Sequence, residues 1–303
     1  MKYEFSTTYE YRGANFILAV AILKKLLIVD GHNLLFQMFF GMPSRIINKK
    51  GKPIQGVLGF VGALNKIIKL IEPTHVAVIF DGEHENERAE ILPEYKTNRV
   101  DYSEIPEGEN PFSQIKDIYS ALDFMGIKHF EEQVYEADDV IASYAITYAE
   151  DTQIVISSFD SDFFQLINNN ISVLRYRGVK TIICDTAYVQ SKLGILPCQY
   201  ADFKSLTGDN SDNIKGAEKV GVKTAAALIN QFGSLQNIIK NTDSITKPSI
   251  QKSIKKNVEK LENNYKLIKL KNNSSLKYEI DALLYSNKGL STIEVLKGIM
   301  IYE

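Results

Sequence analysis

Acidic residues are concentrated in one stretch of this chain. The motifs EADD (residues 136–139) and DSD (residues 160–162) place five carboxylates within 27 residues, and an apolar run at residues 154–156 lies between them. That run predicts a buried strand. Carboxylates held this close together repel one another, and each is costly to bury unpaired. We therefore expect a hard divalent cation with oxygen ligands to hold them together.

Three acidic residues follow apparent strands. Asp30, Asp81 and Asp160 each come after a run of apolar, β-branched residues typical of a strand buried on both faces. Helical patterns separate these runs, which predicts a mainly parallel sheet with its ligand site at the carboxyl ends of the strands. A lone Asp after a strand is usually a turn residue or a helix cap. Three of them favour one shared site.

A further pair, Asp209 and Asp212, is spaced i, i+3 and would share one face of a helix. The full set of candidate metal ligands is Asp30, Asp81, Glu136, Asp138, Asp139, Asp160, Asp162, Asp209 and Asp212. Nine acids suit two or more Mg²⁺ ions, for which Mn²⁺ can substitute. Two such ions about 3.5–4 Å apart can activate a water against a phosphodiester, so no nucleophilic side chain is needed. We expect His32 to be a packed or capping residue.

Two further segments carry candidate contacts to a substrate. Residues 83–112 form a long excursion from the sheet, which indicates a lid or arch or, alternatively, an ordinary solvated loop. Residues 207–233 predict two helices around a glycine-bearing turn, which suits a phosphate-backbone clamp, although a plain helical hairpin is the commoner case. The candidate catalytic residues are Lys96, Arg99, Asp138 and Asp160. The candidate DNA contacts are Arg88, Tyr95, Lys96, Arg99, Lys215, Lys219, Gly221, Lys223 and Thr224.

The charge distribution supports a nucleic-acid partner. The net charge is −2, but residues 213–277 hold 13 lysines against four acidic residues. The molecule therefore has an acidic centre and a basic flank.

Length and composition predict an α/β protein. The chain has 303 residues, 45% of them hydrophobic, which is enough for a large core with a smaller appendage. We expect an unassigned N-terminal extension at residues 1–25, an α/β core at 26–206 that carries most of the candidate metal ligands, and a DNA-binding region at 207–303. The apolar run at residues 16–23 is too short to span a bilayer. Two cysteines without metal or disulfide spacing favour the reducing cytoplasm, and we expect a monomer with no membrane partner.

The motifs occur in an order that resembles a known family. VDG (residues 29–31), FDG (80–82), YKTNR (95–99), EADD, DSD and GDNSDNI (208–214) are similar to those of the bacterial and phage 5′-3′ exonuclease/flap endonuclease family, akin to the N-terminal nuclease domain of DNA polymerase I. The similarity covers residues 26–233, and the chain resembles the stand-alone form. It implies a PIN-like core with a helical arch and a helix-hairpin-helix (helix-3-turn-helix) subdomain.

The resemblance also implies roles for individual residues. It assigns Asp30, Asp81, Glu136, Asp138 and Asp139 mainly to a first metal, and Asp160, Asp162, Asp209 and Asp212 mainly to a second. Lys96 and Arg99 would lie near the scissile phosphate, and K⁺ would bind carbonyls of the helix-hairpin-helix turn. The chain departs from the family at three positions: Lys215 stands in place of Pro, Lys219 in place of Gly, and Phe159 in place of a small residue.

We therefore expect a metal-dependent 5′ nuclease that acts on flaps, overhangs or nicked duplex DNA and leaves a 5′-phosphate, with RNA primers as a further candidate substrate. A PIN-type ribonuclease is one alternative, but it would leave Asp209, Asp212 and the clamp unexplained. A branched-DNA-binding protein with weak catalysis is another, but it has no need for so many carboxylates. A small-molecule phosphohydrolase would need neither the arch nor the basic flank.

Overall fold

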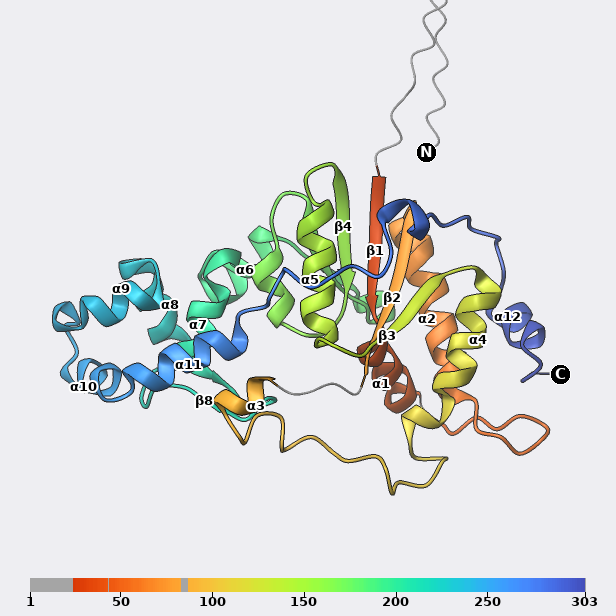
Figure 1. Ribbon diagram of the computed structural model, residues 1–303, viewed down its shortest axis with the longest axis horizontal. Helices are drawn as coiled ribbons and strands as arrows, with labels where there is room; N and C mark the ends of the chain where they lie inside the picture. The colour runs from red at the N-terminus through yellow and green to blue at the C-terminus, as the bar shows by residue number, and fades with distance from the viewer. Residues whose placement is uncertain (1–23, 43, 83–86, 303) are drawn as a thin grey trace, which may run out of the picture.

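A six-stranded sheet forms the centre of the computed structural model, which describes residues 24–42, 44–82 and 87–302 (Figure 1). The strand order is β3-β2-β1-β4-β5-β6, and only β6 of these strands runs antiparallel to its neighbour. The strands are β1 (Lys24–Asp30), β2 (His75–Asp81), β3 (Lys128–Glu132), β4 (Thr152–Ser157), β5 (Ile171–Arg175) and β6 (Ile182–Cys184). The predicted α/β fold with a mainly parallel sheet is confirmed.

Both faces of the sheet are covered. Successive residues of β1 point to opposite faces, so Leu26 and Ile28 join one core while Leu27 and Val29 join the other. One face is covered by α5 (Ala137–Tyr148). The other is covered by α1 (Gly31–Gly41), α2 (Gln55–Ile71), α4 (Ile115–Met125) and α12 (Thr292–Gly298). Burial on both faces explains why the strands are continuously apolar.

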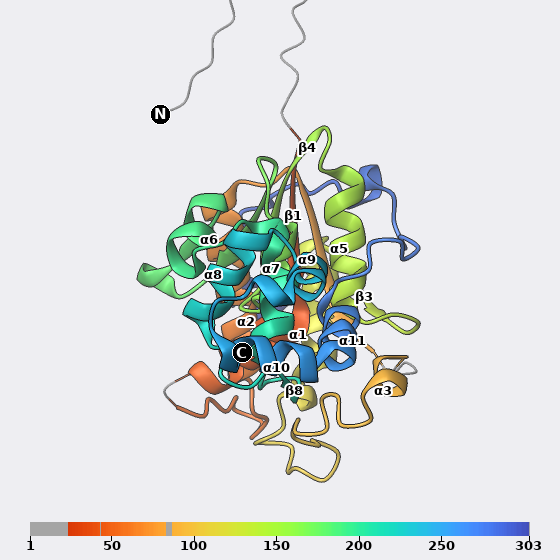
Figure 2. The same cartoon turned by 90° about the vertical axis from the view of Figure 1, so that its left-hand side faces the viewer.

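A helical lobe extends from one end of the sheet, at the left of Figure 1 and towards the viewer in Figure 2. It contains α6 (Thr186–Leu193), α7 (Tyr200–Thr207), α8 (Val222–Phe232), α9 (Leu235–Lys240), α10 (Pro248–Lys256) and α11 (Val258–Ile268). A short hairpin of β7 (Gly208–Asp209) and β8 (Ile214–Lys215) lies between α7 and α8. The chain turns at Asn257, which separates α10 from α11.

The predicted arch is helical only at its two ends. Its described part consists of α3 (Glu87–Ile91), a series of turns, and the 3₁₀ turn η1 (Pro111–Gln114). Residues 83–86 and the predicted extension up to residue 23 lie outside the described residues. Over the described ranges, every helix is too short or too polar to cross a membrane.

Candidate metal and nucleic-acid site

Four aspartates line one cavity of about 860 Å³ beyond the carboxyl ends of the strands, and Glu131 lines it as well. Asp30 ends β1, Asp81 ends β2, Asp138 lies in the first turn of α5, and Asp160 follows β4. We call these four residues the first acidic group. The three strands are neighbours in the sheet, so the topology alone brings the acids together.

Local hydrogen bonds fix the strand-end carboxylates. Asp30 caps α1 by accepting from the Asn33 amide at 3.0 Å, and it also accepts from the Ser158 hydroxyl at 2.8 Å. Asp81 accepts from the Ala137 amide at 3.0 Å, which ties β2 to the start of α5. The glycine after Asp30 is required, since a Cβ at Gly31 would lie 2.5 Å from the Phe80 ring.

Negative charge in the first acidic group is poorly compensated. Burial, together with the nearby charges of Asp160 and Asp81, raises the pKa of Asp30 to about 7. Burial and the charge of Asp160 raise the pKa of Asp138 well above its usual range. Such shifts are expected where carboxylates share a site that lacks a cation.

Glu136 and Asp139 are instead neutralised by basic side chains. Arg88 is 6% exposed and pairs with Glu136 at 2.8 Å and Asp139 at 2.9 Å. Lys96 also contacts Glu136 at 2.8 Å. Burial would raise the pKa of Glu136, but Lys96 and Arg88 outweigh it and hold the pKa below its usual value. Asp139 further accepts from the Lys271 amide at 2.9 Å, so this oxygen faces the C-terminal segment.

Two of the predicted DNA contacts, Arg88 and Tyr95, are buried. Arg88 is enclosed in the network above, and it also donates to the Leu267 carbonyl at 3.0 Å. Tyr95 is 5% exposed, packs with Ile214 and Ile268, and directs its hydroxyl at Glu136. Both residues have charged and polar neighbours in the sequence, which does not reveal that the end of α11 covers them.

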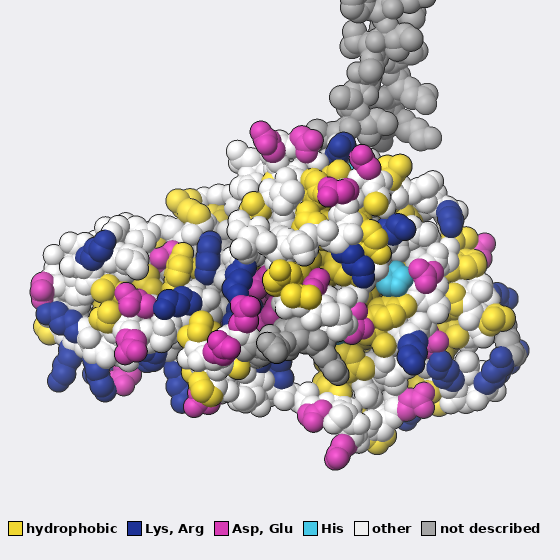
Figure 3. Space-filling view, viewed as in Figure 1, with side chains coloured by type: hydrophobic (Ala, Val, Ile, Leu, Met, Phe, Trp, Pro, Cys, Tyr) yellow, Lys and Arg dark blue, Asp and Glu magenta, His cyan; other side chains and the backbone are white. Residues whose placement is uncertain are grey.

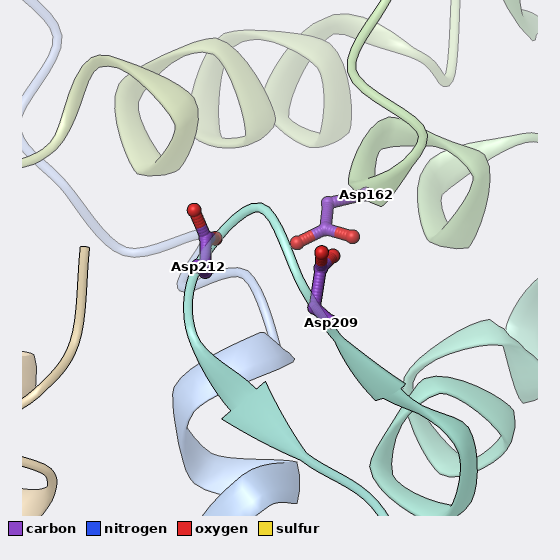
Figure 4. A group of neighbouring side chains, drawn as sticks. All are labelled: Asp162, Asp209 and Asp212. Atoms are coloured by element: carbon purple, nitrogen blue, oxygen red, sulfur yellow. The ribbon is translucent and has the colours of Figure 1, made fainter. Parts of the chain in front are cut away.

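A second acidic group consists of Asp162, Asp209 and Asp212, whose carboxylates point toward one another (Figure 4). One oxygen of each lies within 4.8 Å of the others. The Asp162 Oδ1 atom is buried and has no hydrogen-bond partner within the described part of the chain. Burial and Asp160 raise the pKa of Asp162 well above its usual range.

The second acidic group carries basic partners. Lys204 of α7 pairs with Asp209, and Arg99 contacts Asp212 at 3.0 Å. Burial would raise the pKa of Asp209, but hydrogen bonds from Lys204 and Ser211 hold it below its usual value. The expectation that Asp209 and Asp212 share a helix face is wrong, because they lie on the β7–β8 hairpin.

The YKTNR segment is docked on this hairpin. The Lys96 amide donates to the Asp212 carbonyl at 3.2 Å, and the Asn98 side chain donates to the Asn210 carbonyl at 2.9 Å. The Asn213 side chain donates to the Glu94 carbonyl at 3.0 Å. Lys96 and Arg99 thereby reach the wall of the cavity that holds the first acidic group.

The predicted clamp has an exposed basic surface. Lys215, Lys219, Gly221 and Lys223 are exposed, and Thr224 is half-buried at the start of α8. Lys219 adopts φ +65°, so this lysine takes the left-handed conformation usually reserved for glycine. Further Lys and Arg side chains protrude over α10 at the lower left of Figure 3.

Two other residues of the site, Lys204 and Ser158, were not predicted from the sequence. Lys204 and Ser158 bind candidate ligands directly, as described above. Lys204 lies one helical turn before the GDNSDNI motif, which is a signal that could have identified it. His32 packs edge-on between Phe80 and Phe112, with ring centroids at 5.6 and 5.1 Å, and burial lowers its pKa.

Family models now identify the class of this chain. The model of the 5′-3′ exonuclease N-terminal resolvase-like domain matches residues 25–194, and that of the 5′-3′ exonuclease C-terminal SAM fold matches residues 195–289. The chain belongs to the 5′-3′ exonuclease family, whose members are nucleases.

Individual relatives agree. The chain is 33% identical over 261 residues to the thermostable DNA polymerase I of Thermus filiformis, covering 86% of this chain and 30% of that protein. The chain thus spans about a third of the length of this relative. It is similar to the bacteriophage T5 D15 flap endonuclease, solved as a pseudo-enzyme–product complex with DNA and metal ions (TM-score 0.67, 25% identity, 82% of this chain and 89% of that one). The catalytic core of Rad2 with DNA substrate shares the fold (TM-score 0.56, 17% identity, 92% and 93% coverage).

Proposed function

We propose that this protein is a metal-dependent, structure-specific 5′ nuclease that hydrolyses DNA phosphodiesters at 5′ flaps and ends and leaves a 5′-phosphate. The observation that carries the proposal is the convergence of the two acidic groups beside Lys96 and Arg99. The T5 flap endonuclease supports it, since that relative was crystallised with DNA and metal ions. RNA primers and nicked duplexes are further candidate substrates.

The carboxylates suit divalent cations. The orphaned Asp162 Oδ1 and the raised pKa values of Asp30 and Asp138 indicate sites that lack positive charge. All donors are oxygens, which favours Mg²⁺ or Mn²⁺. When bound, two such ions supply an activated water and stabilise the leaving oxygen. In this proposal the first acidic group and Glu136 hold one ion, and the second acidic group, with Asp160 alongside, holds the other.

Asp139 has a different role in this proposal. Its Oδ1 atom is engaged by Arg88 and by the Lys271 amide, so Asp139 positions Arg88 and the first turn of α5. Arg88 in turn orients Glu136. Such supporting contacts commonly determine how well carboxylates bind a metal.

Lys96 and Arg99 are proposed to bind the scissile phosphate. Both side chains line the cavity, and both are paired with carboxylates of the candidate metal sites. A cation bound by those carboxylates would compete for them and leave the ammonium and the guanidinium directed at the phosphate. Preorganised charge of this kind stabilises the transition state. The exposed lysines of the clamp would then hold the adjoining duplex.

The test is cleavage of a 5′-labelled flap duplex with Mg²⁺ or Mn²⁺. Cleavage that yields a 5′-phosphate and is lost in Asp138→Ala and Asp160→Ala supports the proposal. Full activity of both variants in clean protein refutes the proposed site. Faster turnover of single-stranded RNA than of the DNA flap would indicate a PIN-type ribonuclease instead. Flap binding in EDTA without cleavage in Mg²⁺ would indicate a binding protein.

A further inference from the structure

The turn between β8 and α8 is held by side chains from α11. We call residues 215–221 the clamp turn. Lys260 Nζ donates to the Gly216 carbonyl at 2.8 Å. Asn264 Nδ2 donates to the Lys215 carbonyl at 3.0 Å and to the Ser205 carbonyl at 3.0 Å, which joins the clamp turn to α7. Both donors lie on one helix, four residues apart, and therefore on one face.

The Gly216 carbonyl has a fixed position. A Cβ at Gly216 would lie 2.4 Å from the Leu206 carbonyl oxygen and 2.6 Å from the Gly208 amide, so the glycine packs directly on the backbone that leads into the hairpin. The next amide, that of Ala217, donates to Leu206 at 2.8 Å. The ammonium of Lys260 thus meets a carbonyl that close packing keeps in place.

A monovalent metal ion fits this arrangement poorly. The family resemblance implies K⁺ on the turn carbonyls, but those of Lys215 and Gly216 already accept from α11. Those of Ala217 and Gly221 accept from backbone amides of Val220 and Ala225. Positive charge is already close to these carbonyls. Burial lowers the pKa of Lys260, and the neighbouring charges of Lys256 and Lys215 lower it further, while Glu218 acts in the opposite direction.

We propose that the ammonium of Lys260 replaces the monovalent cation of the clamp, so that this protein binds duplex DNA without requiring K⁺. The inference rests on the proposed DNA-binding function. An ammonium has three N–H donors, and within the described part of the chain Lys260 uses one of them, on Gly216. The other two are available to a DNA phosphate, with Lys215 and Lys256 nearby. Lys260 is therefore a positioning residue of the clamp turn and also a phosphate contact.

The experiment measures affinity for a labelled flap duplex by fluorescence anisotropy in EDTA. Ionic strength is kept constant with KCl, NaCl or tetramethylammonium chloride. The wild-type protein should give a dissociation constant that agrees within about twofold in all three salts. Lys260→Gln should bind about tenfold more weakly in tetramethylammonium, with affinity partly restored by K⁺. Lys260→Arg should remain independent of K⁺.

Lys266→Gln is the matched control, because it removes one exposed lysine from the same helix. It should weaken binding slightly and equally in every salt, since it removes only long-range charge. Wild-type binding that needs K⁺, or a Lys260→Gln protein that equals the wild type in all salts while melting at the same temperature, would overturn the inference. The assay measures binding in EDTA, where no metal-dependent cleavage occurs. Its result is therefore valid even if the protein proves to be catalytically inactive. Absence of flap binding in any salt would instead refute the proposed function.

Discussion

The two acidic groups of this protein are assembled by different means. Asp30, Asp81 and Asp160 are brought together by three neighbouring parallel strands, whose ends meet at one edge of the sheet. Asp209 and Asp212 lie on a small hairpin that belongs to the helical lobe. Contacts from distant segments keep that hairpin in place.

The charge balance of the two groups differs accordingly. A sheet edge concentrates carboxylates without neutralising them, and the pKa of Asp30 is raised to about 7. The hairpin carboxylates have basic partners, because Lys204 pairs with Asp209 and Arg99 with Asp212. We therefore expect the first acidic group to depend more strongly on a bound cation than the hairpin does.

The largest expected effect is on catalysis by the first acidic group. Asp138→Ala or Asp160→Ala should each lower the cleavage rate of a 5′ flap by about a thousandfold or more, because metal stabilisation supplies several kcal/mol. The rate is measured in single turnover at saturating Mg²⁺. Glu150→Ala, which removes an exposed acid of the same fold, should leave the rate unchanged. A loss of less than about tenfold in both aspartate variants would contradict the expectation that the first acidic group depends strongly on a bound cation.

Arg88 gives the next largest effect. Arg88→Met removes a buried cation from Glu136 and Asp139, which leaves Asp139 without its charged partner and Glu136 with Lys96 alone. We expect the free energy of unfolding in EDTA to fall by about 3 kcal/mol, as measured by urea denaturation. Saturating Mg²⁺ should restore part of the loss. Equal destabilisation with and without Mg²⁺ would show that Arg88 is structural only.

The hairpin should respond more weakly to substitution. Asp209→Asn retains the shape of the residue but removes its pairing charge with Lys204. We expect the Mn²⁺ concentration for half-maximal cleavage to rise about tenfold, with the maximal rate largely recovered at high Mn²⁺. The comparison would fail if Asp209→Asn abolished cleavage as fully as Asp138→Ala at all Mn²⁺ concentrations.

The smallest effect concerns pH and stability. A carboxyl whose folded pKa exceeds its unfolded value stabilises the fold below about pH 4 and loses that contribution as pH rises through the folded pKa. For Asp30 this window runs from about 4 to about 7. In EDTA, Asp30→Asn should therefore be more stable than the wild type at pH 8 but not at pH 4.

Thermal unfolding at the two pH values checks this expectation, with the Mg²⁺-loaded proteins as the control. Excess Mg²⁺ at pH 8 should reverse the order, because only the wild type keeps the Asp30 charge. An Asn variant that is less stable than the wild type at pH 8 in EDTA would show that the charge of Asp30 is already compensated without metal.

The central strands could be predicted from the sequence, because local residue patterns determine them. The apolar runs that end at Asp30 and Asp81 are β1 and β2, and the apolar run at residues 154–156 lies in β4. Strand β3 was missed, because it lies at the sheet edge, is partly exposed and has polar residues on both sides of a single apolar one, Phe130. Edge strands lack the continuous apolar signal of central ones.

Contacts between segments that are distant in the sequence could not be predicted from it. The end of α11 covers Arg88 and Tyr95, and the segment after this helix binds Asp139 through the Lys271 amide. No motif in the sequence indicated these contacts. An i, i+3 spacing suggested a helix for Asp209 and Asp212, but Gly208 at φ +82° ends α7 and starts a hairpin. Nothing in the spacing of residues 88–99 indicated which of them would be buried.

The docking of the YKTNR segment has a consequence for substrate discrimination. Four hydrogen bonds join residues 94–99 to residues 210–213, so the two segments shift as one body. A DNA strand that moves Lys96 and Arg99 also moves the backbone of Asp212. Under the proposed function, recognition of strand shape and completion of the hydrolytic centre are a single event, and a misfitting strand leaves that centre unfinished.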